Sequence, residues 1–322
     1  MSNLVSDKKL FVALHKYAED FNWTCMAPKC KQKCINSHVL QKNGVLSQIS
    51  VNKHLIEVKP VTIWELEDEG TLKFQKIGIN RAFTFPGFCS LHDNSIFDLI
   101  EKETINFKNY KVQLLFSYRG LCQEIRRKQI LKLFLSQVLK RSDEFKVIDV
   151  VEAFSDYRNG LDVGIRNLNY YKGAIEDDLK KNTKSFDFYL RERPYVEICT
   201  SAPINVKEPN EKKFATLEDI KKNTFRNKLS TTFVNIFPYD NVSKWIIGEH
   251  RSHRSSYTLH LLEKEWEQGL TDLLVLRMEY WCMSETFLNK HIKPHVEEIK
   301  ESYMRNALNF DFNLSTTLNI FK

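Results

Sequence analysis

The sequence predicts an α+β fold that combines a small module rich in cysteine and histidine with a helical middle, an antiparallel sheet and C-terminal helices. Four of the seven cysteines precede residue 90. Apolar residues follow a helical period between residues 107 and 182, and β-branched and aromatic residues alternate between 183 and 250. With 322 residues, of which 42% are hydrophobic, the chain is long enough to bury a sizeable core.

These changes in composition indicate two domains. The first, residues 1–106, holds the cysteine-rich module and an N-terminal helix. The second, residues 107–322, is an α+β domain that begins with helices, continues with strands and ends with helices. Its three parts are expected at residues 107–182 (helical), 183–250 (sheet-rich) and 256–308 (helical).

In the first domain we expect one helix and one hairpin. Residues 5–21 predict a short amphipathic helix, because Leu10, Leu14 and Tyr17 recur at helical spacing. Residues 55–66 and 71–77 are rich in strand-forming residues and predict two paired strands, joined by a turn at residues 68–70. The segment VLQKNGVLSQIS between helix and hairpin is expected to be an interrupted helix.

The longest helix of the second domain is expected over residues 107–141. Apolar residues from Leu114 to Ile125 are spaced there by four, three and four positions, as on one face of a helix. The remaining predictions are a helix over residues 147–181, at least three antiparallel strands between 185 and 250, and closing helices over 259–282 and 287–308 with a break near Pro294.

Two short segments of the first domain concentrate the residue types that bind zinc. TCMAPKC holds Cys25 and Cys30, and the four residues between them can form a turn that aims both sulfurs at one point. FCSLHD holds Cys89 and His92, whose spacing places both in the first turn of a helix. Structural zinc sites use four thiolate or imidazole ligands. The sequence therefore predicts a structural Zn²⁺ on two ligand pairs, in a treble-clef-like module.

The same stretch offers two alternative zinc ligands. Cys34 could replace Cys30, and His38 could serve as the fourth ligand. The other cysteines have no ligand-type neighbours and are expected to be small buried hydrophobic residues: Cys122, Cys199 and Cys282. Clustered cysteines in odd number favour metal over disulfides and a reducing compartment, so a cytoplasmic location is expected.

The order of these features resembles the zinc-stapled members of the HNH nuclease group. Paired cysteines are followed by Ser37 and His38, then by a strand-rich insert and a second ligand pair that opens a helix. The resemblance covers about residues 24–103 and implies a ββα-metal fold. It makes His38 the general base that activates water, and it makes Asp93 and Asn94 helpers in holding a catalytic Mg²⁺ or Mn²⁺. It also implies a role in bacterial antiviral defence.

His38 has a second interpretation. Many family members carry Asp or a second His just before this histidine, whereas this chain has Ser37, a poorer ligand for a hard cation. If Ser37 prevents the binding of a catalytic cation, His38 is either a zinc ligand or a hydrogen-bonded histidine at the start of a helix. The module would in that case be non-catalytic.

The net charge of +7 is unevenly distributed. Residues 24–59 contain six lysines against one acid, Glu57, and residues 107–141 contain nine cations against Glu124. Basic segments beside a zinc module are typical of proteins that bind phosphate backbones, although a basic helix face is often only solvated. The predicted nucleic-acid contacts are Lys31, Lys33, Arg126, Arg127 and Lys128.

Two function classes follow from these observations. The first is a metal-dependent endonuclease that depends on His38. The second is a non-catalytic zinc-stabilised module that binds nucleic acid or a protein partner. The chain has no P-loop, no dinucleotide-binding glycine pattern and no Gly-x-Ser-x-Gly motif, which excludes the enzyme classes built on them. Since no eighteen consecutive residues are apolar, no membrane partner is expected.

Overall fold

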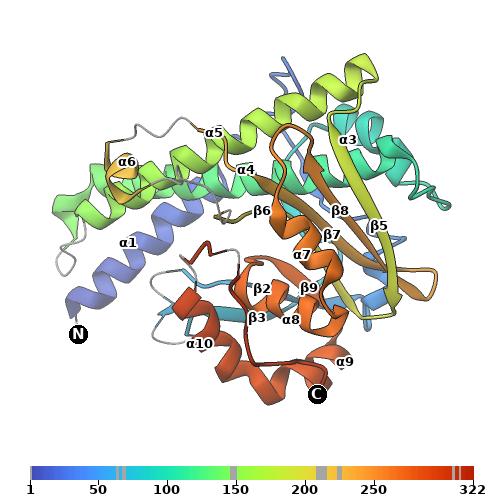
Figure 1. Ribbon diagram of the computed structural model, residues 1–322. Helices are drawn as coiled ribbons and strands as arrows, with labels where there is room; N and C mark the ends of the chain where they lie inside the picture. Colours follow the sequence, from blue (N-terminus) through green and yellow to red (C-terminus); the bar gives the residue numbers. More distant parts are fainter. Residues whose placement is uncertain are drawn as a thin grey trace.

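The computed structural model describes residues 2–62, 65–66, 70–145, 151–207, 216–222, 227–306, 309–311 and 313–322, and it confirms the α+β class (Figure 1). Within this part of the chain, a seven-stranded antiparallel sheet lies between two groups of helices. Its strand order is β3-β2-β9-β6-β7-β8-β5. The strands are β2 (His54–Pro60), β3 (Leu72–Gly78), β5 (Phe186–Pro194), β6 (Ile198–Asn205), β7 (Thr231–Tyr239), β8 (Val242–His250) and β9 (Trp281–Met283).

Two long helices cover one face of the sheet. They are α4 (Tyr110–Lys140) and α5 (Val151–Lys181), and α1 (Ser2–Glu19) packs along the C-terminal half of α4. Successive side chains of a strand point to opposite faces, so Phe233 and Phe237 of β7 pack into the core beneath α4. Their neighbours Val234 and Ile236 enter the core on the other side of the sheet.

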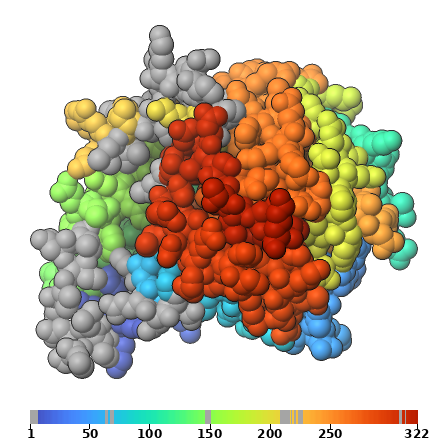
Figure 2. All heavy atoms as spheres, turned by 60° about the horizontal axis from the view of Figure 1, so that its bottom comes forward, coloured from blue at the N-terminus to red at the C-terminus, as the bar shows by residue number. Residues whose placement is uncertain are grey.

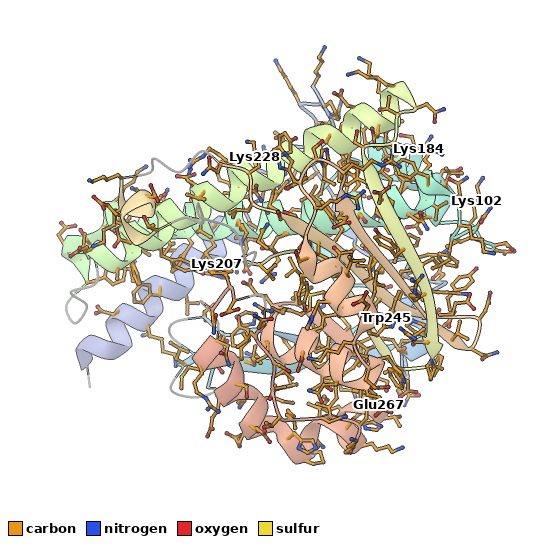
Figure 3. The ribbon with its side chains drawn as sticks, in the orientation of Figure 1. Lys102, Lys184, Lys207, Lys228, Trp245 and Glu267 are labelled. Carbon is orange, nitrogen blue, oxygen red and sulfur yellow. The ribbon has the colours of Figure 1, made fainter. Side chains whose placement is uncertain are left out.

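The other face is covered by α7 (Ser256–Glu263), α8 (Trp266–Leu276) and α10 (Val296–Asn306). Trp245 of β8, labelled in Figure 3, is buried in this core. The C-terminal residues lie across this layer, as Figure 2 shows. They are held there by the side-chain amide of Gln268 on α8, which donates hydrogen bonds to the carbonyls of Thr316 and Leu318, both at 3.0 Å. The expected break near Pro294 is present, since α9 (Glu285–Phe287), a π-turn (Leu288–Ile292) and a 3₁₀ turn (Lys293–His295) precede α10.

Gly120 lets α4 approach the sheet closely. A Cβ atom at this position would lie 2.2 Å from the hydroxyl oxygen and 3.2 Å from the backbone carbonyl carbon of Ser201 on β6. Real side chains do not tolerate the first of these distances. The glycine in SYRGLC is therefore required by helix–sheet packing rather than by backbone conformation.

Two expectations about the elements need correction. The helix expected over residues 259–282 is divided, because α7 ends at Glu263 and α8 spans Trp266–Leu276. Its last two residues, 281 and 282, belong to strand β9, which pairs with β2 on one side and β6 on the other. The hairpin of β2 and β3 therefore belongs to the large sheet, and the predicted domain division at residue 106 crosses that sheet. In the turn predicted between these strands, residues 68 and 69 lie outside the described residues.

A second, two-stranded sheet lies near the N-terminal part of α4. It pairs β1 (Asn36–His38) with β4 (Thr84–Pro86), and α3 (Ser90–Phe97) follows directly. The segment expected to be an interrupted helix contains only the 3₁₀ turn Leu46–Ile49 as regular helical structure. The remaining short elements are 3₁₀ turns at Asp98–Ile100 and Ser142–Glu144 and the helix α6 (Leu217–Lys221). Among the described residues, no helix is both long enough and apolar enough to span a bilayer.

Candidate metal centre

The first ligand pair lies on a tight loop, residues 24–33, which we call the knuckle. A bridge between Thr24 and Lys33 closes it, and the backbone amide of Cys25 donates to the carbonyl of Gln32 at 2.8 Å. Inside the loop, the amide of Cys30 donates to the carbonyl of Ala27 at 3.2 Å. The four residues between Cys25 and Cys30 thus turn the chain back, so both sulfurs face the same side.

The second ligand pair lies at the start of α3. Cys89 occupies the N-cap position with extended backbone, and His92 lies in the first helical turn. The entry into this helix is fixed by Ser37 of β1, whose hydroxyl is buried and accepts a hydrogen bond from the amide of Phe88 at 3.1 Å. Ser37 therefore has a local structural role in placing Cys89, a role that the sequence pattern did not reveal.

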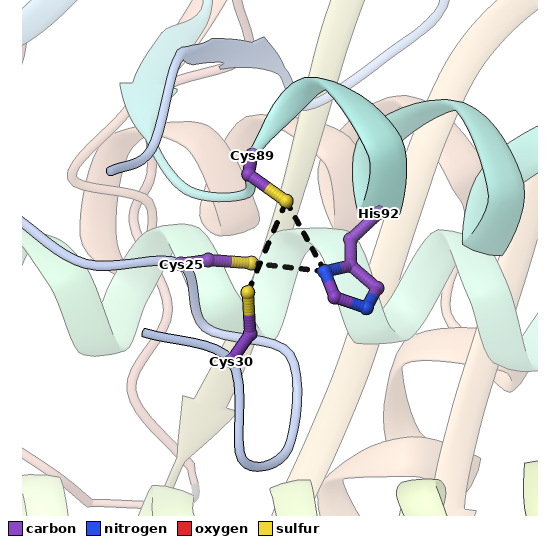
Figure 4. Close-up of side chains that lie close together, drawn as sticks. All are labelled: Cys25, Cys30, Cys89 and His92. Atoms are coloured by element: carbon purple, nitrogen blue, oxygen red, sulfur yellow. Dashed lines mark hydrogen bonds between the residues drawn. The ribbon is translucent and has the colours of Figure 1, made fainter. Parts of the chain in front are cut away.

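The fold brings these two pairs together (Figure 4). The four ligand atoms of Cys25, Cys30, Cys89 and His92 lie within 4.8 Å of one another. Nδ1 of His92 lies 3.5 Å from Sγ of Cys25 and 3.2 Å from Sγ of Cys89, and the sulfurs of Cys30 and Cys89 are 3.9 Å apart. A tetrahedral zinc site has edges of roughly 3.5 to 3.8 Å between such atoms. The spacing of the donor atoms therefore fits a single ion of this type.

The thiols of this cluster have different proton affinities. The backbone amide of His92 donates to Sγ of Cys89, and this lowers the pKa of Cys89 to about 7. Burial raises the pKa of Cys25 to about 11. A metal ion requires thiolate ligands, so metal binding must release a proton from Cys25 at neutral pH.

The two alternative ligands lie outside the four-residue group. Cys34 is partly buried just after the knuckle, and its amide donates to the carbonyl of Trp23 at 3.1 Å. Nε2 of His38 lies 3.2 Å from the carbonyl oxygen of Ile79. Burial lowers the pKa of His38, so its ring is neutral near pH 7.

Of the other two candidate catalytic residues, Asp93 lies beside Arg119. A guanidinium nitrogen of Arg119 lies 3.6 Å from the carboxylate of Asp93, and a second pairs with Glu101. The charge of Arg119 also contributes to the lowered pKa of His38. Asn94 is exposed on α3. Among the described residues, neither His38 nor Asp93 joins a group of three metal-binding side chains.

Arg126 attaches the knuckle to α4. Its side chain is only 4% exposed, and Nη2 donates to the carbonyl of Thr24 at 2.7 Å. The guanidinium also lies over the ring of Trp23, 4.5 Å from its centroid. This burial removes Arg126 from the candidate nucleic-acid contacts, and it identifies Trp23 as a residue that the sequence analysis missed.

The other predicted nucleic-acid contacts differ in their exposure. Lys31 and Lys33 are exposed on the knuckle. Arg127 and Lys128 are partly buried and pair with the carboxylate of Glu124 at 3.1 and 2.8 Å. The basic helix predicted from the sequence is therefore partly neutralised within the fold, and the knuckle lysines are the accessible cations.

Comparisons with known proteins identify no relative of this chain. No family model, curated protein or solved structure matches it. The resemblance to the HNH nucleases therefore rests on the order of residues in the sequence, and the nuclease activity stays a prediction. The three cysteines expected to be small hydrophobic residues are indeed buried: Cys122, Cys199 and Cys282.

Proposed function

We propose that the protein is a zinc-stabilised module that binds nucleic acid through its knuckle. The observation that carries the metal assignment is the group of four donor atoms within 4.8 Å. Three thiolates and one imidazole are typical ligands of zinc, whereas Mg²⁺ and Ca²⁺ prefer oxygen ligands. Four protein ligands fill the tetrahedral coordination shell of the ion and leave no position for water or substrate, so the zinc would be structural rather than catalytic.

The exposed cations of the knuckle support a polyanionic partner. Lys29, Lys31 and Lys33 are all exposed on this ten-residue loop, and none of them forms an ion pair within the described part of the chain. The metal would hold the loop in one conformation, so the lysines would contact phosphates without a large loss of chain entropy. The lysines labelled in Figure 3, by contrast, are spread over separate parts of the molecule.

Metal content tests the first part of the proposal. We expect about one zinc ion per chain from elemental analysis, because four ligands bind one ion. Cys89→Ser should lose the metal, whereas Cys34→Ser should retain it because Cys34 lies outside the cluster. A zinc-free wild-type protein of normal stability would refute the metal assignment.

Salt-dependent binding tests the second part. Lys31→Glu with Lys33→Glu should weaken binding of single-stranded or duplex oligonucleotides and flatten the dependence of log Kd on log salt by about one to two units. The matched control is Lys207→Glu with Lys322→Glu, two exposed lysines outside the knuckle. Equal losses in both double variants would indicate a net-charge effect. Undetectable binding of the wild type at low salt would favour a protein partner instead.

One observation favours a second candidate, the metal-dependent nuclease. His38 ends strand β1, β1 pairs with β4, and β4 leads directly into α3, an order similar to that of the ββα-metal nucleases. A neutral, half-buried imidazole suits proton abstraction from water near pH 7. The opposing observation is Arg119, since a hard cation at Asp93 would have to compete with a guanidinium.

Cleavage assays separate the two candidates. A nuclease should cut plasmid, single-stranded DNA or RNA in Mg²⁺ or Mn²⁺, and His38→Ala should abolish cleavage without changing the zinc content. His54→Ala is the matched control, because His54 is an exposed histidine at the start of β2. If His38→Ala removes the zinc, or if the purified wild type does not cleave, the binding-module function remains.

A further inference from the structure

A second, separate site is a cleft between α4, strand β6 and helix α10. Its volume is about 120 Å³, and its charged lining comes from Glu124, Arg127 and Lys128 of α4 and from Arg277 and Glu279, which follow α8. A single water molecule needs roughly 10 to 15 Å³ of such space, so the cleft can admit a polar ligand group. It lies on the part of α4 that the sequence analysis identified as basic.

Two cations of this cleft, Arg127 and Lys128, are held in place by the partly buried carboxylate of Glu124. Glu124 is 13% exposed and pairs with Arg127 and Lys128 at 3.1 and 2.8 Å. Although burial opposes it, the charges of Glu124 and Glu279 raise the pKa of Lys128, which therefore stays protonated. Desolvating such a cluster is unfavourable and gives little net stability, so stability alone does not account for it.

The outer edge of Arg127 has a weaker partner. Its Nη2 lies 3.4 Å from the carboxylate of Glu279, a side chain that is 49% exposed. The guanidinium of Arg127 lies over the ring of Tyr280, 5.2 Å from its centroid. The hydroxyl of Tyr280 in turn donates a hydrogen bond to the carboxylate of the buried Glu57. Glu124 and Tyr280 thus hold the Arg127 side chain on one side. On the other side, an anion that binds the guanidinium more tightly than Glu279 can displace Glu279.

We infer that the cleft binds the phosphate group of an organic phosphate monoester, and that this phosphate replaces Glu279 at Arg127 and also contacts Lys128. The lining carries three cations against two carboxylates, an excess of one positive charge that favours an anionic ligand. Arginine binds phosphate through two parallel hydrogen bonds, and lysine binds it as a point charge.

The remaining walls suit the organic part of such a ligand. Tyr303 presents an aromatic ring, and Leu168, Pro203 and Ile204 present apolar side chains. Burial raises the pKa of Tyr303, so its hydroxyl stays protonated and is available as a donor. Aromatic and apolar walls around a few polar groups are typical of small-molecule sites, and they favour an organic phosphate over inorganic phosphate.

Titration calorimetry of the full chain tests the inference with adenosine 5′-monophosphate, ribose 5-phosphate, adenosine and inorganic phosphate. We expect adenosine 5′-monophosphate to bind, adenosine not to bind, and Arg127→Gln to weaken binding at least tenfold. Glu279→Gln should strengthen binding severalfold, because it removes the competing carboxylate from an exposed position without disturbing the fold. Glu263→Gln, the same change at an exposed residue of α7, should leave the affinity unchanged.

Three results would overturn the inference. The first is an unchanged or weaker affinity in Glu279→Gln. The second is equal binding of inorganic phosphate and adenosine 5′-monophosphate, which would exclude the organic part of the ligand. The third is loss of oligonucleotide binding without loss of mononucleotide binding in Arg127→Gln, which would assign the cleft to nucleic acid. None of these results bears on the zinc content or on the knuckle lysines, so the two proposals can fail separately.

Discussion

Replacing Gly120 by alanine should destabilise the protein, although alanine is the better helix former. In an open helix the change would stabilise by about 1 kcal/mol. Here the added Cβ would lie 2.2 Å from Oγ of Ser201, so α4 or β6 must shift, and overpacking of this kind costs about 1 to 3 kcal/mol. The displaced hydroxyl also loses its 2.7 Å hydrogen bond to Asn235, which is worth about 1 kcal/mol.

The expected net loss is therefore about 1 to 3 kcal/mol in the free energy of unfolding, measured by urea denaturation with equal zinc content. Gly173→Ala is the matched control, because Gly173 lies inside α5 with no atom within 4 Å of its added Cβ. This variant should gain about 0.5 to 1 kcal/mol. Ser201→Ala should cost less in the Gly120→Ala background than in the wild type. If Gly120→Ala stabilises the protein as Gly173→Ala does, the close approach of α4 to β6 is not real.

Three further predictions concern the metal module and the pH dependence. Arg126→Met should lower the free energy of unfolding, measured in urea, by about 1.5 to 3 kcal/mol, because it removes the buried charged donor to the carbonyl of Thr24. An unchanged free energy of unfolding would mean that this contact does not hold the knuckle. A zinc chelator should lower the Tm of the wild type but not that of Cys89→Ser, in calorimetric scans with and without the chelator. Burial lowers the pKa values of His250 and His253, so the unfolded chain binds protons more tightly and stability should fall as pH drops below about 6.5. His250→Gln should reduce this slope in urea unfolding between pH 7.5 and 5, and an unchanged slope would contradict the burial of its ring.

The sequence by itself determined the local features of this protein. Periodicity predicted the α4 helix over residues 107–141, within three residues of its observed bounds, because an amphipathic stripe depends only on nearby residues. Alternation predicted strands β2 and β3 for the same reason, although the strand expected over residues 55–66 ends at Pro60. The set of Cys25, Cys30, Cys89 and His92 could also be chosen from spacing, since each pair lies within one turn of chain.

Tertiary structure alone decided the features that join distant residues. Strand β9 has only three residues, too few for a periodic signal, and it is a strand because β2 and β6 flank it. The sequence does not distinguish the environments of the three consecutive cations of α4. In the structure, Arg126 is buried over Trp23, whereas Arg127 and Lys128 line a cleft with Glu124. Burial and ion pairing depend on which elements meet, and a residue's own neighbours in the chain do not contain that information.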